Sequence, residues 1–235
     1  ESLAVSPQSI KKSGRVLYAL SCFYFPFYDC PPGTLFYHYD LFGCVSAAVY
    51  YIDELVETGC PSNEVLEQLQ ELQGYLNHRI SAPQAIERLM ADARRYYSFE
   101  ERMIKRAEYS LADLVMITGI RSFDFRLMHH ALLHLVKADY DEAVFEWFQA
   151  FETRMEVEDD LSSITDDMRS GTINMYCLAK NRFPDAASAF VRSYLESNEH
   201  KLESLQRALS PLQRDKCAII LGRYRDIVKK PGVPD

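Results

Sequence analysis

The sequence EDDLSSITDDMRSGTIN, residues 158–174, decides how this chain is interpreted. Asp159, Ser163 and Asp167 follow one another at intervals of four residues, so a helix would bring their oxygen atoms onto one face. At a rise of about 1.5 Å per residue, the row is about 12 Å long. Such hard oxygen ligands suit Mg2+, which binds one or two carboxylates together with substrate phosphates. The stretch therefore predicts a helix that carries a metal-binding face.

A second acidic stretch, YYIDELVE, covers residues 50–57. Asp53 and Glu57 are one helical turn apart, so they share a face. Carboxylates at this interval are also common on ordinary solvated helix faces, and that interpretation remains open for both stretches. Taken as a pair, the two acidic faces favour a site for metal ions and a diphosphate.

The rest of the sequence predicts an all-α fold. Hydrophobic residues make up 48% of the 235 residues, only 9 are Gly, and no segment alternates apolar and polar residues as a strand would. We expect a multi-helix bundle that forms a single domain over residues 1–235. Residues 7–27 are expected to form one helix or a pair of helices. The other expected helices cover residues 37–57, 63–77, 83–100, 101–117, 126–137, 139–168, 172–181, 184–209 and 211–228.

Composition restricts the partners and the compartment. The net charge of -8 disfavours nucleic acid, which needs clustered Lys and Arg. An acidic protein that binds an anionic substrate needs cations between the two. The six Cys form no zinc spacing, which favours a reducing, cytoplasmic setting, and no apolar run is long enough to span a membrane. His129, His130 and His134 lie in an apolar segment without a zinc motif, which favours packing or proton transfer.

With both acidic stretches placed, the chain resembles the class I terpene synthases of the isoprenoid synthase fold. Residues 50–57 resemble the family motif DDxx(D/E), with Glu54 in place of the second Asp. Residues 159–167 resemble the motif (N/D)DxxSxxxE, with Asp167 in place of the final Glu. In the family a Gly and an Asn commonly follow, and Gly171 and Asn174 match approximately.

Two further sequence features carry the resemblance. Arg223 and Tyr224 are similar to a C-terminal Arg-Tyr pair that reaches the diphosphate in the family. Arg121 and Asp124 are similar to an Arg that senses diphosphate and the Asp three residues after it, although Arg106 and Arg126 are rivals for that role.

The resemblance implies an enzyme with a central active-site cavity that ionises and cyclises a linear prenyl diphosphate, with farnesyl diphosphate as the expected substrate. It implies Mg2+ as the cofactor, with Mn2+ as the alternative ion, and a monomer or homodimer. The implied metal ligands are Asp53, Glu57, Asp159, Ser163 and Asp167. The implied catalytic residues are Arg223, Tyr224, Arg121 and Asp124, and the implied substrate-binding residues are Tyr50, Phe151, Asn174, Arg223 and Tyr224.

Two other functions remain open. A prenyltransferase of the same fold would join an allylic diphosphate to an acceptor, although elongating enzymes usually carry two DDxxD motifs. A helical interaction protein without catalytic activity would carry the same acidic faces toward solvent.

Overall fold

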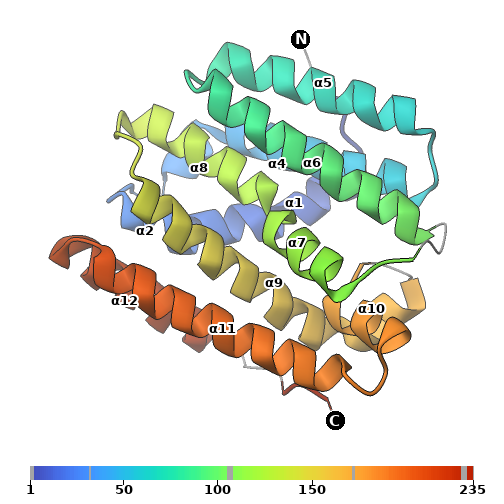
Figure 1. Cartoon of the computed structure of the whole chain (residues 1–235). Coiled ribbons are helices and arrows are strands. Elements are labelled where there is room, and N and C mark those ends of the chain that lie inside the picture. Colours follow the sequence, from blue (N-terminus) through green and yellow to red (C-terminus); the bar gives the residue numbers. More distant parts are fainter. Residues whose placement is uncertain (1–2, 32, 105–107, 171–172, 229–231, 235) are drawn as a thin grey trace. The chain divides into compact units, whose positions relative to one another are not determined.

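The computed structural model describes residues 3–31, 33–104, 108–170, 173–228 and 232–234. Every regular element in these ranges is a helix (Figure 1). The prediction of an all-α multi-helix fold is therefore confirmed. Within the same ranges, no helix is both long and apolar enough to cross a membrane.

The chain divides into two compact units, each of which joins two separate stretches of sequence. Unit 1 contains residues 1–101 and 123–140, and unit 2 contains residues 102–122 and 141–235. The single domain over residues 1–235, the isoprenoid synthase type of the fold and its central cavity stay predictions.

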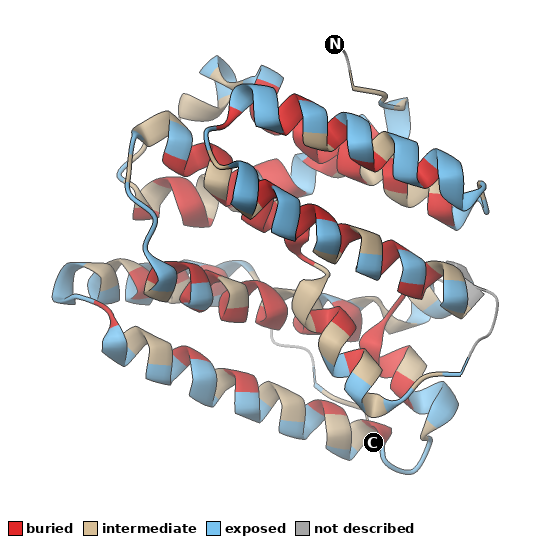
Figure 2. Ribbon diagram, turned by 45° about the horizontal axis from the view of Figure 1, so that its top comes forward, coloured by how far each residue is buried: buried red, intermediate tan, exposed pale blue. Residues whose placement is uncertain are grey.

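Unit 1 is built around α4, a helix of 19 residues that packs against α1, α5 and α8. Its buried residues are mostly small and β-branched, which lets neighbouring helices approach closely. Figure 2 shows the result, with buried residues along one side of many helices and exposed residues along the other. The elements of unit 1 are α1 (Pro7–Ala19), the π-helical segment η1 (Leu20–Tyr24), α2 (Phe25–Phe27), α3 (Thr34–Tyr37), α4 (Tyr39–Glu57), α5 (Ser62–Arg79), α8 (Phe123–Val136) and most of α6 (Pro83–Ile104).

Local sequence signals set the ends of the helices in unit 1. Ser6 caps α1 by accepting a hydrogen bond from the Ser9 N–H, and Pro7 follows at the first helical position. Helix α4 ends at Glu57, and Gly59, two residues later, has a φ of 74° that favours glycine. There the N–H groups of Gly59 and Cys60 donate to the carbonyls of Val56 and Leu55, which satisfies the last turn.

Unit 2 is organised by α9, a helix of 29 residues that packs against α7, α10 and α11. Val157 and Leu161 of α9 form an apolar cluster with Met175 and Tyr176 of α10 and Val191 of α11. The elements of unit 2 are α7 (Leu111–Ile120), α9 (Glu142–Ser170), α10 (Met175–Arg182), α11 (Ala187–Ala208) and α12 (Pro211–Ile227).

Several predicted helix boundaries are a few residues off, and the largest error lies between residues 101 and 117. The helix expected over residues 101–117 does not form as such, because α6 continues to Ile104 and α7 begins at Leu111. Ser110 and Asp113 explain the second boundary, since each side chain accepts a hydrogen bond from the other residue's N–H. This capping box starts a new helix in the middle of the segment that was predicted to be continuous.

Candidate functional site

The predicted acidic row lies on the continuous helix α9. Asp159 is exposed, whereas Ser163 and Asp167 are half-buried. The Ser163 hydroxyl lies 2.5 Å from Oδ2 of Asp167 and 2.9 Å from the backbone oxygen of Asp159. Val157 and Leu161, which lie between the row positions in sequence, belong to the apolar core of unit 2. The helix therefore separates the oxygen-bearing residues from the core-forming ones, as the four-residue interval predicts.

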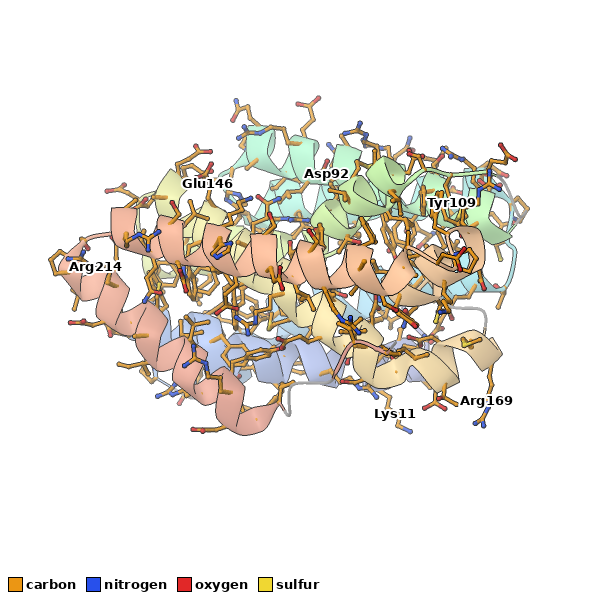
Figure 3. The ribbon with its side chains drawn as sticks, turned by 60° about the horizontal axis from the view of Figure 1, so that its bottom comes forward. Lys11, Asp92, Tyr109, Glu146, Arg169 and Arg214 are labelled. Carbon is orange, nitrogen blue, oxygen red and sulfur yellow. The ribbon has the colours of Figure 1, made fainter. Side chains whose placement is uncertain are left out.

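The carboxylate next to the row in sequence points elsewhere. Asp166 is exposed and lies 3.7 Å from Arg169 in a surface ion pair. Arg169 projects away from the ribbon at the C-terminal end of α9 (Figure 3). Asp166 is thus a natural comparison for Asp167, one residue away on the same helix.

Asn174 connects the start of α10 to the acidic row. Its side-chain oxygen accepts the Cys177 N–H and caps α10, while its Nδ2 donates to Oδ2 of Asp167 at 2.8 Å and to the backbone oxygen of Asp160 at 2.6 Å. The side chain is fully buried. Asn174, predicted to bind substrate, thus holds Asp167 in place. Gly171, the other residue of that match, lies outside the described residues.

Asp160 is a buried carboxylate that the sequence analysis missed. Its Oδ1 accepts from the Arg121 guanidinium at 2.7 Å, and its Oδ2 accepts the Met175 N–H at 2.7 Å. Burial raises the pKa of Asp160 to about 6, although Arg121 and the Met175 hydrogen bond oppose the rise. Asp160 therefore ties α9 both to the end of α7 and to the first turn of α10.

Arg121, the predicted diphosphate sensor, is held by two carboxylates of α9. Besides Asp160, its guanidinium Nε lies 3.1 Å from Glu156, and only about a fifth of its side chain is exposed. Glu156 also accepts a hydrogen bond from the Ser122 hydroxyl at 3.0 Å. Glu156 and Asp160 are one turn apart on α9, and this four-residue interval places both carboxylates on the face that meets Arg121.

The other residues predicted around Arg121 and the first motif belong to unit 1. Asp124 is half-buried in the first turn of α8, and Arg126, a rival of Arg121 for the role of diphosphate sensor, is buried two residues later. Tyr50 is half-buried on α4, one turn before the first acidic cluster. Arg106, the second rival, lies outside the described residues.

The two residues of the predicted Arg-Tyr pair differ in burial. Arg223 is exposed, whereas Tyr224 is buried and its hydroxyl donates to Oε2 of Glu158 at 2.7 Å. Burial and the Glu158 carboxylate raise the pKa of Tyr224 far above its ordinary value, so the hydroxyl is protonated and donates. Glu158 also accepts from Nε of Arg154 at 3.0 Å, and Arg154 pairs with Glu199 as well. This network joins α9 to α11 and α12.

Phe151 lies in an aromatic stack next to that network. Its ring is parallel to the ring of Trp147 at 5.5 Å and meets the ring of Tyr224 edge-on at 5.3 Å. The side chain is fully buried. These contacts place Phe151 in the core of unit 2, and its role at a substrate stays a prediction.

In unit 1, Asp53 is held by a tyrosine that the sequence analysis did not single out. The Tyr97 hydroxyl of α6 donates to Oδ1 of Asp53 at 2.7 Å. Burial raises the pKa of Tyr97 well above its ordinary value, and the Asp53 charge adds to the rise. Tyr97 is therefore a hydrogen-bond donor throughout the physiological pH range.

The two glutamates of this cluster contact α1. Ser6 donates its hydroxyl to Oε2 of Glu54 at 2.6 Å, and Lys12 lies 3.5 Å from Glu57. Glu57 is exposed, and a surface ion pair of this kind contributes about 0–1 kcal/mol. A divalent cation could therefore compete for Glu57, whereas Glu54 takes part in the packing of α1 on α4.

One histidine of α8, His129, forms a buried hydrogen bond with a tyrosine. Nε2 of His129 lies 2.6 Å from the Tyr28 hydroxyl, and His129 is fully buried. Burial lowers the pKa of His129 well below its ordinary value and the pKa of His130 to about 4. Both rings are therefore neutral near pH 7, which agrees with packing or proton transfer.

The donor types of both acidic clusters fit Mg2+. In the part of the chain that the structure describes, no group of three or more His, Cys, Asp or Glu could hold a metal ion. The α9 row instead offers two carboxylates and one hydroxyl, from Asp159, Ser163 and Asp167. Mg2+ usually takes one or two carboxylates and completes its shell with water and phosphate oxygens, so this oxygen-only set fits the ion.

Comparison with known proteins found no relatives: no protein-family model, curated protein or solved structure matches the chain.

Proposed function

We propose that the chain is a Mg2+-dependent enzyme that ionises and cyclises a linear prenyl diphosphate, with farnesyl diphosphate as the expected substrate, and releases diphosphate. The observation that carries the proposal is the α9 row, in which the buried Asn174 fixes Asp167 beside Ser163. A buried amide that orients a half-buried carboxylate is typical of the support that metal ligands receive. A solvated acidic face has no need of it.

Asp159, Ser163 and Asp167 would hold Mg2+ in unit 2, and Asp53 and Glu57 would be the metal ligands of unit 1. Mg2+, when bound, supplies positive charge that stabilises the departing diphosphate. The protein's own part is to keep these oxygens in place before substrate arrives, which avoids reorganisation during the reaction.

Arg223 and Tyr224 have separate tasks in this proposal. The exposed Arg223 donates to diphosphate oxygens through its planar guanidinium. Tyr224 donates to Glu158 and packs against Phe151, so it fixes the rotation of α12 on which Arg223 depends. We therefore assign Tyr224 a positioning role, in which Glu158 holds its hydroxyl.

The test combines product analysis with a matched pair of variants. The purified chain is incubated with Mg2+ and farnesyl diphosphate, and volatile products are analysed by gas chromatography and mass spectrometry. We expect a cyclic hydrocarbon or alcohol from the unaltered chain and from Asp166→Ala, whose carboxylate pairs with Arg169 on the surface. Asp167→Ala should lower turnover by orders of magnitude while its circular dichroism spectrum remains helical.

The same incubation distinguishes the second candidate, a helical protein without catalytic activity. The contacts of Arg121 with Glu156 and Asp160 favour this second candidate. In them, protein carboxylates accept the hydrogen bonds of a guanidinium that was predicted to donate to diphosphate. Under the proposed function, Mg2+ with diphosphate at 100 times its dissociation constant should add about 2.7 kcal/mol to the free energy of unfolding. Absence of both product and thermal shift would overturn the proposal. A product that forms only with an added prenyl acceptor would identify a prenyltransferase.

A further inference from the structure

Tyr97 is a buried tyrosine whose hydroxyl is directed at a predicted metal ligand. Only 3% of the residue is exposed, and its ring meets Tyr96 at 5.3 Å and Phe123 at 5.9 Å, both nearly edge-on. The ring therefore has little freedom to move. Its hydroxyl donates to Oδ1 of Asp53 at 2.7 Å and lies 3.4 Å from the backbone oxygen of Val49.

The hydrogen bond from Tyr97 restricts Asp53 and is compatible with cation binding. A carboxylate has two oxygens and about four acceptor positions, so accepting a hydroxyl proton does not by itself prevent it from binding a cation. A half-buried Asp on a helix otherwise samples several side-chain rotamers, and binding a cation would have to freeze them. A rigid donor on α6 selects one rotamer before the cation arrives.

We propose that Tyr97 is a positioning residue that orients the Asp53 carboxylate for Mg2+, an inference that rests on the proposed function. Its hydroxyl makes the contact to Asp53 that Asn174 makes to Asp167, so a buried neutral donor serves a carboxylate in each acidic cluster. Removal of partners of this kind typically weakens metal binding about 10- to 100-fold. Tyr97 itself does not touch the metal or the substrate.

The competing explanation is that the hydrogen bond merely fastens α6 to α4. Tyr75 supplies a matched control, because it is also a buried tyrosine of unit 1 that donates to α4. Its hydroxyl lies 3.0 Å from the backbone oxygen of Asp40, far along α4 from the acidic cluster. Tyr97→Phe and Tyr75→Phe each remove one hydroxyl that joins a neighbouring helix to α4. Only the hydroxyl of Tyr97 donates to a predicted metal ligand.

The experiment titrates Mg2+ into each full-length variant at a fixed concentration of inorganic diphosphate and follows the melting temperature. Both variants are expected to melt lower than the unaltered chain before Mg2+ is added. The Mg2+ concentration at the midpoint should rise about tenfold or more for Tyr97→Phe and should not change for Tyr75→Phe. In an Asp53→Asn background, Tyr97→Phe should produce no further change, because the carboxylate that it orients is gone.

Each outcome bears on a definite part of the inference. Equal midpoints for Tyr97→Phe and Tyr75→Phe, with Asp53→Asn still impaired, would overturn the role of Tyr97 and leave the proposed function standing. An unaltered chain that does not respond to Mg2+ and diphosphate would overturn both. If Tyr97→Phe does not fold, the unaltered chain labelled at the tyrosine Cζ carbons provides the test. The resonance that Asp53→Asn displaces should move as Mg2+ is added, and a stationary resonance would contradict the inference.

Discussion

Asn174→Asp should destabilise unit 2 strongly near neutral pH. An Asp side chain still offers the oxygen that accepts the Cys177 N–H, so the cap of α10 survives the change. The donor that serves Asp167 at 2.8 Å is replaced by a second carboxylate oxygen. Two unit charges about 4 Å apart repel by about 4 kcal/mol at the effective dielectric constant of 20 that suits protein sites.

Proton uptake limits this cost and gives it a pH dependence. When the two carboxylates share a proton, their folded-state pKa rises above the ordinary Asp value near 3.9. The folded state then binds more protons than the unfolded state, so stability falls as pH rises from about 4. Holding a proton at pH 7 costs about 1.36 kcal/mol for each pH unit above 3.9, which again gives about 4 kcal/mol.

The assay is urea unfolding at pH 7 and at pH 4.5, followed by circular dichroism and by the fluorescence of Trp147, the only tryptophan in the chain. Asn174→Ser is the control, because it keeps a capping oxygen, loses the amide Nδ2 that donates to Asp167 and introduces no charge. We expect this variant to lose about 1–3 kcal/mol of stability. The reasoning is refuted if Asn174→Asp is as stable as the unaltered chain at pH 7. It is also refuted if the difference between the Asp and Ser variants does not shrink at pH 4.5.

Two further predictions follow from burial. Folding lowers the pKa of His130 from 6.5 to about 4, so between these pH values the unfolded state binds a proton that the folded state does not. Stability is therefore lost as pH falls. Between pH 7 and pH 5 the loss is about 2 kcal/mol at most, and partial solvent access to the ring reduces it. His130→Gln should flatten this dependence in urea unfolding, and a matching change at the exposed His200 should not. Burial raises the pKa of Cys177 to about 11 and the pKa of Cys217 to about 12. Iodoacetamide at pH 8 should therefore label both thiols more slowly than the thiol of the half-buried Cys60. Equal labelling rates for the three residues, measured by peptide mass spectrometry, would contradict this prediction.

Sequence periodicity predicted correctly those features that depend on a single helix. The interval of four residues in Asp159, Ser163 and Asp167 predicted their alignment on α9, because helical geometry alone fixes which side chains share a face. The predicted end of the helix over residues 37–57 likewise agrees with α4, which ends at Glu57, two residues before Gly59 and its positive φ. The break between α6 and α7 was placed wrongly, since the Ser110–Asp113 capping box was not recognised.

The partners of the polar side chains could not be predicted in this way. Arg121 was expected near a diphosphate, and the structure pairs it with Glu156 and Asp160, more than thirty residues away. The Tyr224 hydroxyl likewise meets Glu158, 66 residues earlier in the chain. Such contacts depend on how far each helix is rotated against its neighbour, and rotation is set by the packing of whole apolar faces.

The order of residues along the chain was enough to predict most of the helices and the oxygen-bearing face of α9, because these depend on residues within about one turn of each other. The tertiary structure alone decided that Tyr97 reaches Asp53, that Asn174 reaches Asp167, and that Asp160 is buried against Arg121. These contacts join side chains from different helices, and only the close packing of the folded chain brings such groups within hydrogen-bonding distance.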